Sequence, residues 1–267
     1  MARHADHSGA IKAEGGSGFG QKGFPEKGHG SGVWVGLDPD HTRQVLVRVG
    51  ISYVSEANAR ENLAVENPSG TTFDVLRQKA DAAWNRKLGQ IEIEGGTDDQ
   101  CAVCTTALYH ASMTPNVYSD TNGEYRGMDG KVHRVAGPQQ AQYANFSGWD
   151  VYRSQLQLLT WLDSYIGSDI AQSLLNQSQQ NGGAWDRWTH NSGATHAMNG
   201  DPAAPAIADI WAFGGHGFDA WASLQSLVYA ADVPTAADLS KTGCPVLCEA
   251  ECPGLYQFQQ GVQSYSS

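Results

Sequence analysis

Long hydrophobic runs are missing from this chain. Across its 267 residues no stretch of about 18 apolar residues occurs, so no membrane-spanning helix is predicted. The first 30 residues are rich in glycine, histidine and charge and lack the apolar segment of a signal peptide. Positive charge is scarce too, with 17 Lys and Arg against 28 Asp and Glu and a net charge of -11. Nucleic-acid surfaces need clustered Lys and Arg, so we expect neither nucleic acid nor a membrane as partner.

Cysteine is sparse and odd in number. The five cysteines form two groups, Cys101 with Cys104, and Cys244 with Cys248 and Cys252. An odd count argues against a closed disulfide framework. The first two cysteines recur with Leu108 on one face of a predicted helix, which favours buried free thiols. A zinc site built from these thiolates is the alternative.

The chain is long enough to bury a core, and its 31 glycines indicate many loops. Residues 1–31 show no periodicity and few large apolar side chains, so we expect a poorly structured lead-in there. Residues 33–37 and 45–54 are rich in β-branched side chains that partly alternate with polar ones, which predicts two strands. Two strands alone do not make a stable sheet.

A helical hydrophobic period begins near Thr72. Helices are predicted over 72–88, 98–112, 151–163, 168–180, 203–213 and 219–231, with a short β-prone segment over 89–96. Asp169, Pro202 and Asp219 stand where helix starts favour a cap, a proline or a negative charge. We therefore expect a mainly α fold with a small β part.

The loop over residues 119–133 contains Asp120, Asn122 and Asp129. Their oxygen atoms would suit calcium, but the spacing does not match an EF-hand and no bidentate Glu closes the loop. Asn-Gly and Asp-Gly pairs are turn signals. The sequence therefore favours turns over calcium held by this loop alone.

A second loop, NFSGWDVYRSQLQLL over 145–159, places aromatic and charged residues directly before an apolar run. An indole face packs against the apolar face of a sugar ring, and Asp and Arg side chains bind neighbouring hydroxyls. Trp149, Asp150 and Arg153 are thus candidates for a sugar site. The alternative is that Trp149 belongs to the core and Asp150 caps a helix that begins near Val151.

A third loop, over 182–204, repeats this mixture of residue types. It contains Trp185, Arg187, Trp188, His190, His196 and Asp201. The two histidines have no Cys or Glu at ligand spacing, which argues against a metal site. Two such loops, each before a helix, favour a pocket at one end of a helical array.

Four strings carry a resemblance to a known family. They are ISYVSEANARENLAVE (51–66), ALYHASMTPNVYSDTNGEYRGMDGKVH (107–133), YANFSGWDVYRSQLQLL (143–159) and MNGDPAAPAIADIWAFGGHGFDA (198–220). In this order they resemble glycoside hydrolase family 92, the exo-acting α-mannosidases. The resemblance runs from about Val45 to Ala220, with a weak remnant near 251–258, and residues 1–31 do not fit it.

The resemblance implies an architecture for each segment. Residues 32–71 would be the end of an N-terminal β-sandwich, 72–95 a linker helix and its connection, and 96–267 the first part of an (α/α)6 barrel. By position, two groups would contact the sugar: Trp149, Asp150 and Arg153, and Arg187, Trp188 and Asp201. The string AWDRW (184–188) and Ser164 depart from the family, which commonly has proline there.

The family's chemistry is calcium-dependent hydrolysis of terminal mannose with inversion, by an acid and a base about 6.5–9.5 Å apart. The motif blocks that carry both carboxylates, and most calcium ligands, would lie beyond Ser267. We therefore assign no catalytic residue and no metal ligand, and expect a truncated member that is inactive as an isolated chain. The expected partners are mannose-containing glycans, and such polymeric substrates favour secretion.

Two alternatives to a mannosidase stay open. One is a non-catalytic carbohydrate-binding remnant with the same fold. The other is a thiol–metal module built on the cysteine groups.

Overall fold

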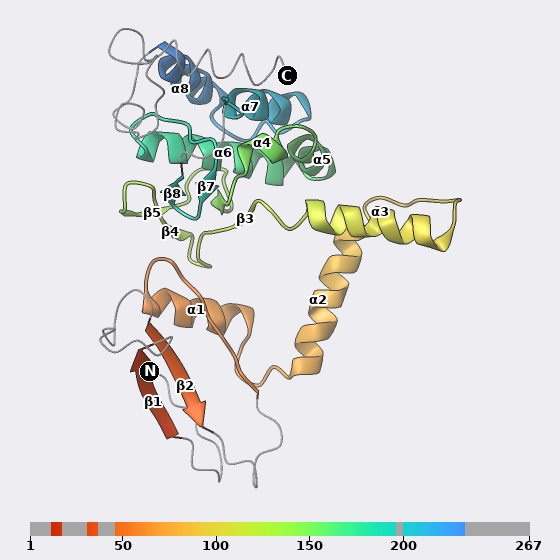
Figure 1. The fold of residues 1–267 in the computed structure, drawn as a ribbon, viewed down its shortest axis with the longest axis vertical. Coiled ribbons are helices and arrows are strands. Elements are labelled where there is room, and N and C mark those ends of the chain that lie inside the picture. Colours follow the sequence, from red (N-terminus) through yellow and green to blue (C-terminus); the bar gives the residue numbers. More distant parts are fainter. Residues whose placement is uncertain (1–11, 18–30, 37–45, 196–199, 233–267) are drawn as a thin grey trace. The chain divides into compact units, whose positions relative to one another are not determined.

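The computed structural model describes residues 12–17, 31–36, 46–195 and 200–232. Contacts divide the chain into two units, residues 1–49 and residues 50–267. The described elements are mainly helices, joined by short two-stranded pairs (Figure 1). The expectation of a mainly α fold with a small β part is confirmed at this level.

The assignments to a sandwich end, a linker and a partial (α/α)6 barrel stay predictions. No described helix is long and apolar enough to cross a membrane.

The first unit contains one antiparallel pair, β1 (Lys12–Ser17) with β2 (Ser31–Gly36), in which Lys12 lies opposite Gly36. Strand β1 lies within residues 1–31, for which a poorly structured lead-in was predicted, and it was missed because backbone pairing does not require an apolar period. Residues 1–11 and 18–30 of that range lie outside the described residues, so the prediction stays untested there. The predicted strand at 45–54 is wrong, since residues 46–54 have no strand structure. A β-rich sequence forms a strand only where a neighbouring strand supplies hydrogen bonds.

The second unit begins with a helix that the apolar period did not indicate, α1 (Glu56–Glu66). Ser55 caps it, because its hydroxyl accepts a 3.0 Å hydrogen bond from the backbone N–H of Asn58. The buried side chains of α1 are Asn58 and Asn62, one turn apart. A helix whose buried face is amide rather than apolar carries no hydrophobic signal.

Helices α2 (Phe73–Leu88) and α3 (Asp98–Ala111) confirm two predicted helices. Thr72 caps the first, and Thr97 forms a reciprocal capping box with Gln100 in the second. The β-prone segment 89–96 between them is not a strand. Of the residues in these two helices only Leu108 is buried, so most of their apolar side chains are exposed.

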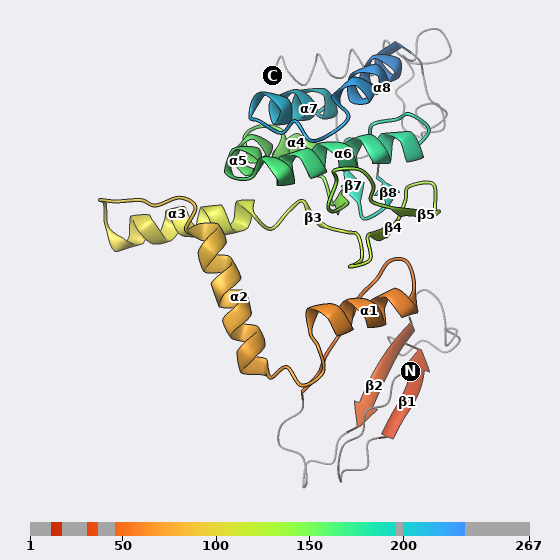
Figure 2. The same ribbon diagram turned by 180° about the vertical axis from the view of Figure 1, so that it is seen from behind.

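The main core lies among α5 (Gln155–Leu162), α6 (Ser164–Gln180), α7 (Ala203–Ala212) and α8 (Ala220–Asp232), which the short α4 (Gly148–Val151) precedes. Leu156, Ile170 and Ile210 are completely buried in it. Helix α6 lies between α7 and α8 on one side and the β-hairpins on the other in both views (Figures 1 and 2). Gly167 lets α5 approach, because a Cβ there would lie 2.4 Å from Thr160 Oγ1.

The boundaries of these helices correct two predictions. The predicted helix at 151–163 is divided between α4 and α5. Helix α6 begins at Ser164 rather than 168, and Asp163 caps it by accepting hydrogen bonds from Tyr165 and Ile166 N–H. Asp169 is therefore no cap. It is buried on α6, and its carboxylate accepts backbone hydrogen bonds from the 140–141 segment.

The remaining predicted helix starts agree with the structure. Pro202 is the N-cap residue of α7. Asp219 caps α8, because its carboxylate accepts a 2.9 Å hydrogen bond from Ala222 N–H.

Three short antiparallel pairs surround the start of the helical array. They are β3 (Asn116–Val117) with β6 (Tyr143–Ala144), β4 (Glu124–Arg126) with β5 (Val132–Arg134), and β7 (Thr189–His190) with β8 (Gly193–Ala194). Gly123 and Gly130 have positive φ angles of 83° and 75° in the turns around β4. The turn prediction for 119–133 is thereby confirmed.

Candidate functional site

Backbone pairing joins the segment before α4 to the segment before β7. Thr189 N–H donates to Phe146 O at 2.9 Å, and Gly148 N–H donates to Arg187 O at 3.0 Å. Between these two bonds, Ser147 forms an antiparallel bridge with Trp188. The two loops that contain Trp, Asp and Arg therefore lie side by side, although 39 residues separate Trp149 from Trp188 in the sequence.

Gly148 brings a third segment to the same place. A Cβ at this position would lie 2.5 Å from Pro202 Cγ and 2.6 Å from Arg187 O, so no larger residue fits without displacing backbone. Asp201 directly precedes Pro202 and the start of α7. The starts of α4 and α7 and the 187–188 segment thus meet around one glycine.

The first group of predicted residues is open to solvent. The guanidinium carbon of Arg153 lies 4.8 Å from the centroid of the Trp149 ring, and its Nε donates to Trp149 O at 3.2 Å. Trp149 is half-buried, and Asp150 and Arg153 are exposed. Asp150 lies inside α4, where its carboxylate accepts a hydrogen bond from the Ser147 hydroxyl. Trp149 is therefore no closed-core residue, and no helix begins at Val151, because Asp150 and Val151 already lie in α4.

The second group is half-buried. Arg187, Trp188 and Asp201 all keep part of their surface exposed. Trp185 differs from Trp188, because it is 8% exposed and its indole N–H donates to Ser226 Oγ at 3.0 Å in the core. His190 is exposed, and His196 lies outside the described residues.

The segments that meet here carry side chains of mixed chemistry. Two indoles, two guanidinium groups and two carboxylates belong to three segments that hydrogen bonds and a close glycine contact hold together. Such a set can pack against the apolar face of a ring and bind its hydroxyl groups.

Comparison with known proteins identifies the family. The family model of the glycosyl hydrolase family 92 catalytic domain matches residues 58–261. The chain belongs to glycosyl hydrolase family 92. The match agrees with the family that the sequence strings indicated.

Solved structures of family 92 enzymes resemble the chain. The α-mannosidase BT3965 from Bacteroides thetaiotaomicron is 28% identical with a TM-score of 0.62, covering 67% of this chain and 24% of that enzyme. The inverting mannosidase BT2199 from the same organism is 26% identical with a TM-score of 0.62, covering 69% of this chain and 25% of that enzyme.

A curated relative is similar over a shorter length. An "Uncharacterized secreted glycosidase" of Arthroderma benhamiae is 33% identical over 82 residues, which is 30% of this chain and 11% of that protein. The chain thus spans about a quarter of the length of the solved family 92 enzymes and a smaller part of this glycosidase.

The resemblance to family 92 implies a calcium ion, so the question is whether carboxylates among the described residues are free to bind one. Asp120, the strongest candidate, is buried, and protein donors already surround its carboxylate. It accepts hydrogen bonds from Ser52 Oγ at 2.7 Å, Asn58 Nδ2 at 2.8 Å and Asn62 Nδ2 at 2.7 Å. Amide N–H and hydroxyl donors therefore occupy the directions in which a cation would bind.

Hydrogen-bond donors of the protein also lie against the carboxylate of Asp129. His133 Nε2 lies 3.0 Å from its Oδ1, and Lys131 N–H donates to the same oxygen at 3.0 Å. These hydrogen bonds, His133 first, lower the pKa of Asp129 below its ordinary value. Within the described residues no three His, Cys, Asp or Glu side chains are grouped to hold a metal ion. This part of the family 92 chain does not fit a calcium site.

The prediction that Cys101 and Cys104 are buried is wrong for both residues. Cys101 is half-buried and Cys104 is exposed, and both are free thiols. The helical pattern placed them correctly on one face with Leu108, but α3 buries only the last of these residues. Cys244, Cys248 and Cys252 lie outside the described residues, so the thiol–metal alternative stays untested.

The sequence singled out these candidate side chains but did not show which backbone contacts join their segments. The sequence around Gly148 does indicate a close contact, because a glycine inside a run of bulky residues often marks a place where two backbones approach each other. Its partners, Arg187 O and Pro202, could not be read from the sequence.

Proposed function

We propose that this family 92 chain contributes a binding surface for a terminal mannose of a glycan. The observation that carries the proposal is the backbone pairing of 146–148 with 187–189, which brings two tryptophan-containing loops together. A solved α-mannosidase of the family, 28% identical to this chain, is a complex with mannoimidazole. That likeness supports mannose as the sugar.

Each residue of the first group has a role in this proposal. Trp149 packs its indole face against the apolar face of the sugar ring. Asp150 accepts hydrogen bonds from neighbouring hydroxyls, and Arg153 donates to hydroxyl oxygens while its contact with Trp149 holds the indole in place.

Arg187, Trp188 and Asp201 form the opposite side of the same surface. The bridge between Ser147 and Trp188 supports this arrangement, because it fixes the two backbones beside each other. Rigid backbone support lowers the ordering cost of binding.

We propose binding without hydrolysis for the isolated chain. Inverting hydrolysis requires an acid and a base, and by family resemblance neither catalytic block has a counterpart in residues 1–267. Stacking and hydroxyl contacts need neither group. Secretion, which the name of the Arthroderma relative supports, is part of the same proposal.

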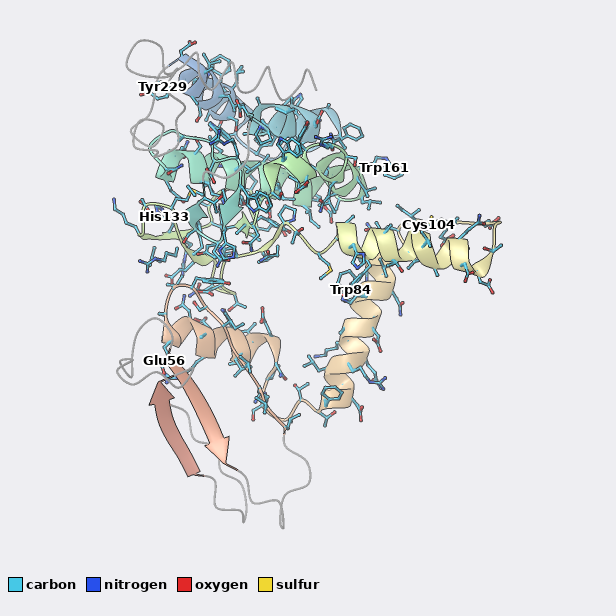
Figure 3. All side chains as sticks on the ribbon, in the orientation of Figure 1. Glu56, Trp84, Cys104, His133, Trp161 and Tyr229 are labelled. Atoms are coloured by element: carbon cyan, nitrogen blue, oxygen red, sulfur yellow. The ribbon has the colours of Figure 1, made fainter. Side chains whose placement is uncertain are left out.

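Binding can be tested by NMR, with the indole N–H signals of Trp149 and Trp188 followed as methyl α-D-mannopyranoside is added. We expect saturable shifts of both signals. Trp149→Ala and Asp150→Ala should each weaken binding about tenfold, which corresponds to roughly 1.4 kcal/mol. Trp161→Ala is the matched control, because Trp161 is an exposed tryptophan of α5 (Figure 3). Unshifted indole signals at saturating sugar would contradict the proposal.

The non-catalytic part has a separate test. Purified residues 1–267 are incubated with an α-linked mannobiose, with and without added calcium, and released mannose is measured. We expect release at the background rate in both. Turnover well above background that Asp150→Ala abolishes would show that the chain hydrolyses the substrate by itself.

A further inference from the structure

A concave site lies between the β4–β5 hairpin and α6, away from the proposed mannose surface. It is a cavity of about 360 Å³, at the lower end of the range for ligand pockets. The hairpin contributes Tyr125, Asp129 and His133 to its lining, and α6 contributes Gln172, Asn176 and Gln180. Figure 3 shows His133 on the hairpin side of the helical array. None of these residues belongs to the mannose surface.

Amide side chains dominate the α6 side of this hairpin pocket, and hydrogen bonds hold them in fixed positions. Gln180 Nε2 donates to the Tyr125 hydroxyl at 3.0 Å, and Gln180 Oε1 accepts from Met128 N–H at 3.3 Å. Gln172 Nε2 donates to Asn176 Oδ1 at 2.9 Å. Asn176 uses its Nδ2 hydrogens on Gln139 Oε1 and Gln142 Oε1, at 3.1 and 3.0 Å. An amide has two donor hydrogens and two acceptor lone pairs, so Gln172 and Gln180 are the amides that keep a donor for a ligand. The groups are thus ordered before a ligand arrives, which lowers the cost of binding.

The charged groups of the hairpin pocket are paired within the protein. Asp129 lies 3.0 Å from His133 Nε2, and Arg134 Nη2 lies 3.7 Å from Glu124 Oε1. An anionic or cationic ligand would have to compete with these partners, of which the Arg134–Glu124 pair, with side chains 62% and 31% exposed, competes only weakly. An uncharged ligand would not.

An aromatic ring completes the lining. The imidazole of His133 stacks on the Tyr125 ring with centroids 5.7 Å apart and planes 27° apart. Tyr125 is buried, and His133 keeps about a third of its side chain exposed, 32%. A flat, half-exposed ring beside fixed amides suits a ligand with one apolar face and several hydroxyls.

We propose that the hairpin pocket is a second binding site, for an uncharged sugar ring. Fixed amides bind its hydroxyls, the His133 ring packs against its C–H face, and paired charges select against anions. The proposal uses no residue of the mannose surface, so it stands or fails independently of the proposed function.

The test follows the side-chain amide signals of Gln172, Asn176 and Gln180 by NMR while methyl α-D-mannopyranoside is added to residues 1–267. Ala136→Trp is the blocking variant, because Ala136 is an exposed residue at the pocket lining and its replacement removes no side-chain hydrogen bond. Val132→Trp is its matched control on the same hairpin, at a position that is 53% exposed and does not line the pocket.

We expect saturable shifts of these amide signals in the wild type and in Val132→Trp, and binding at least tenfold weaker in Ala136→Trp. Asp150→Ala should leave these shifts unchanged while it weakens the indole response about tenfold, which distinguishes the two sites. Unmoved amide signals, equal binding by Ala136→Trp, or loss of the shifts in Asp150→Ala would each overturn the proposal. A larger response to inorganic phosphate than to the sugar would overturn it as well.

Discussion

Helices α1 and α6 both bury one face, but they do so with opposite chemistry. Helix α1 buries Asn58 and Asn62, whereas α6 buries an apolar face that includes Ile170, Ala171 and Leu175, beside polar residues such as Asp169. The apolar face of α6 is stabilised by removal of surface from water, which is not directional. The amide face of α1 is held by hydrogen bonds, which fix distance and angle. Burial alone therefore does not tell which force holds a helix in place.

The contacts of Asn62 show how complete the polar arrangement is. Its Nδ2 donates to Ile51 O at 2.9 Å and to Asp120 Oδ1 at 2.7 Å. Its Oδ1 accepts from Thr121 N–H at 2.9 Å and from Thr121 Oγ1 at 2.8 Å. A single side chain thus connects α1 to the turn before β4. Such networks specify one arrangement, because loss of one member leaves several buried groups unpaired.

Removing apolar volume from the core should have the largest effect. Ile210→Ala truncates a completely buried side chain of α7, and we expect it to lower the free energy of unfolding by about 2–5 kcal/mol. Thermal and urea unfolding measure this change. Leu224→Ala is the control, because Leu224 is 52% exposed on α8. Equal losses in the two variants would mean that the α5–α8 cluster is not the dominant core.

Replacing the Asn62 amide of α1 should lower the free energy of unfolding by less than Ile210→Ala does. Its effect should be confined to α1 and the segments that Asn62 contacts. Asn62→Leu keeps the shape of the side chain and leaves Asp120, Ile51 O and Thr121 without this partner, so we expect a loss of about 1–3 kcal/mol. Hydrogen exchange should show faster exchange in α1 while α6 stays protected. Glu61→Leu, at an exposed position of α1, is the control. Unchanged protection of α1 in Asn62→Leu would show that the network does not hold the helix.

The same contrast explains which parts of the fold the sequence predicted. Helices α2, α3, α7 and α8 follow a 3.6-residue apolar period with caps or a proline at their starts, and their ranges were predicted within one or two residues. Helix α1 was missed because its buried side chains are amides. The strand predicted over 45–54 failed because residue type cannot supply a pairing partner.

For the candidate site too, the sequence indicated one part and not the other. The sequence indicated its side chains by type, since Trp, Asp and Arg recur in two loops before helices. It could not indicate that Gly148 N–H pairs with Arg187 O, because backbone hydrogen bonds between distant segments leave no pattern in residue types. Asp169 was assigned to a cap for a related reason, because an acidic residue near a helix start and one buried under a neighbouring loop look alike in sequence.

The smallest expected effect concerns the first turn of α6, where neither apolar burial nor the amide network acts. Ser164 is exposed and is the first residue of the helix after its cap, Asp163. Proline is favoured at this position, because its fixed φ suits the helix and the missing N–H has no helical partner. Asp163 has φ -155° and ψ 99°, an extended conformation that proline tolerates in the preceding residue.

We therefore expect Ser164→Pro to raise the free energy of unfolding by about 0.4–1 kcal/mol, mainly because the unfolded chain loses conformational freedom. The carbonyl of residue 164, which accepts from Ser168 Oγ at 2.7 Å, is kept in the variant. Urea unfolding of Ser164→Pro beside Ser164→Ala separates the effect of the ring from loss of the hydroxyl. A proline variant less stable than the alanine variant would mean that the ring clashes with the end of α5, and that α6 starts by tertiary contact rather than by local chain geometry.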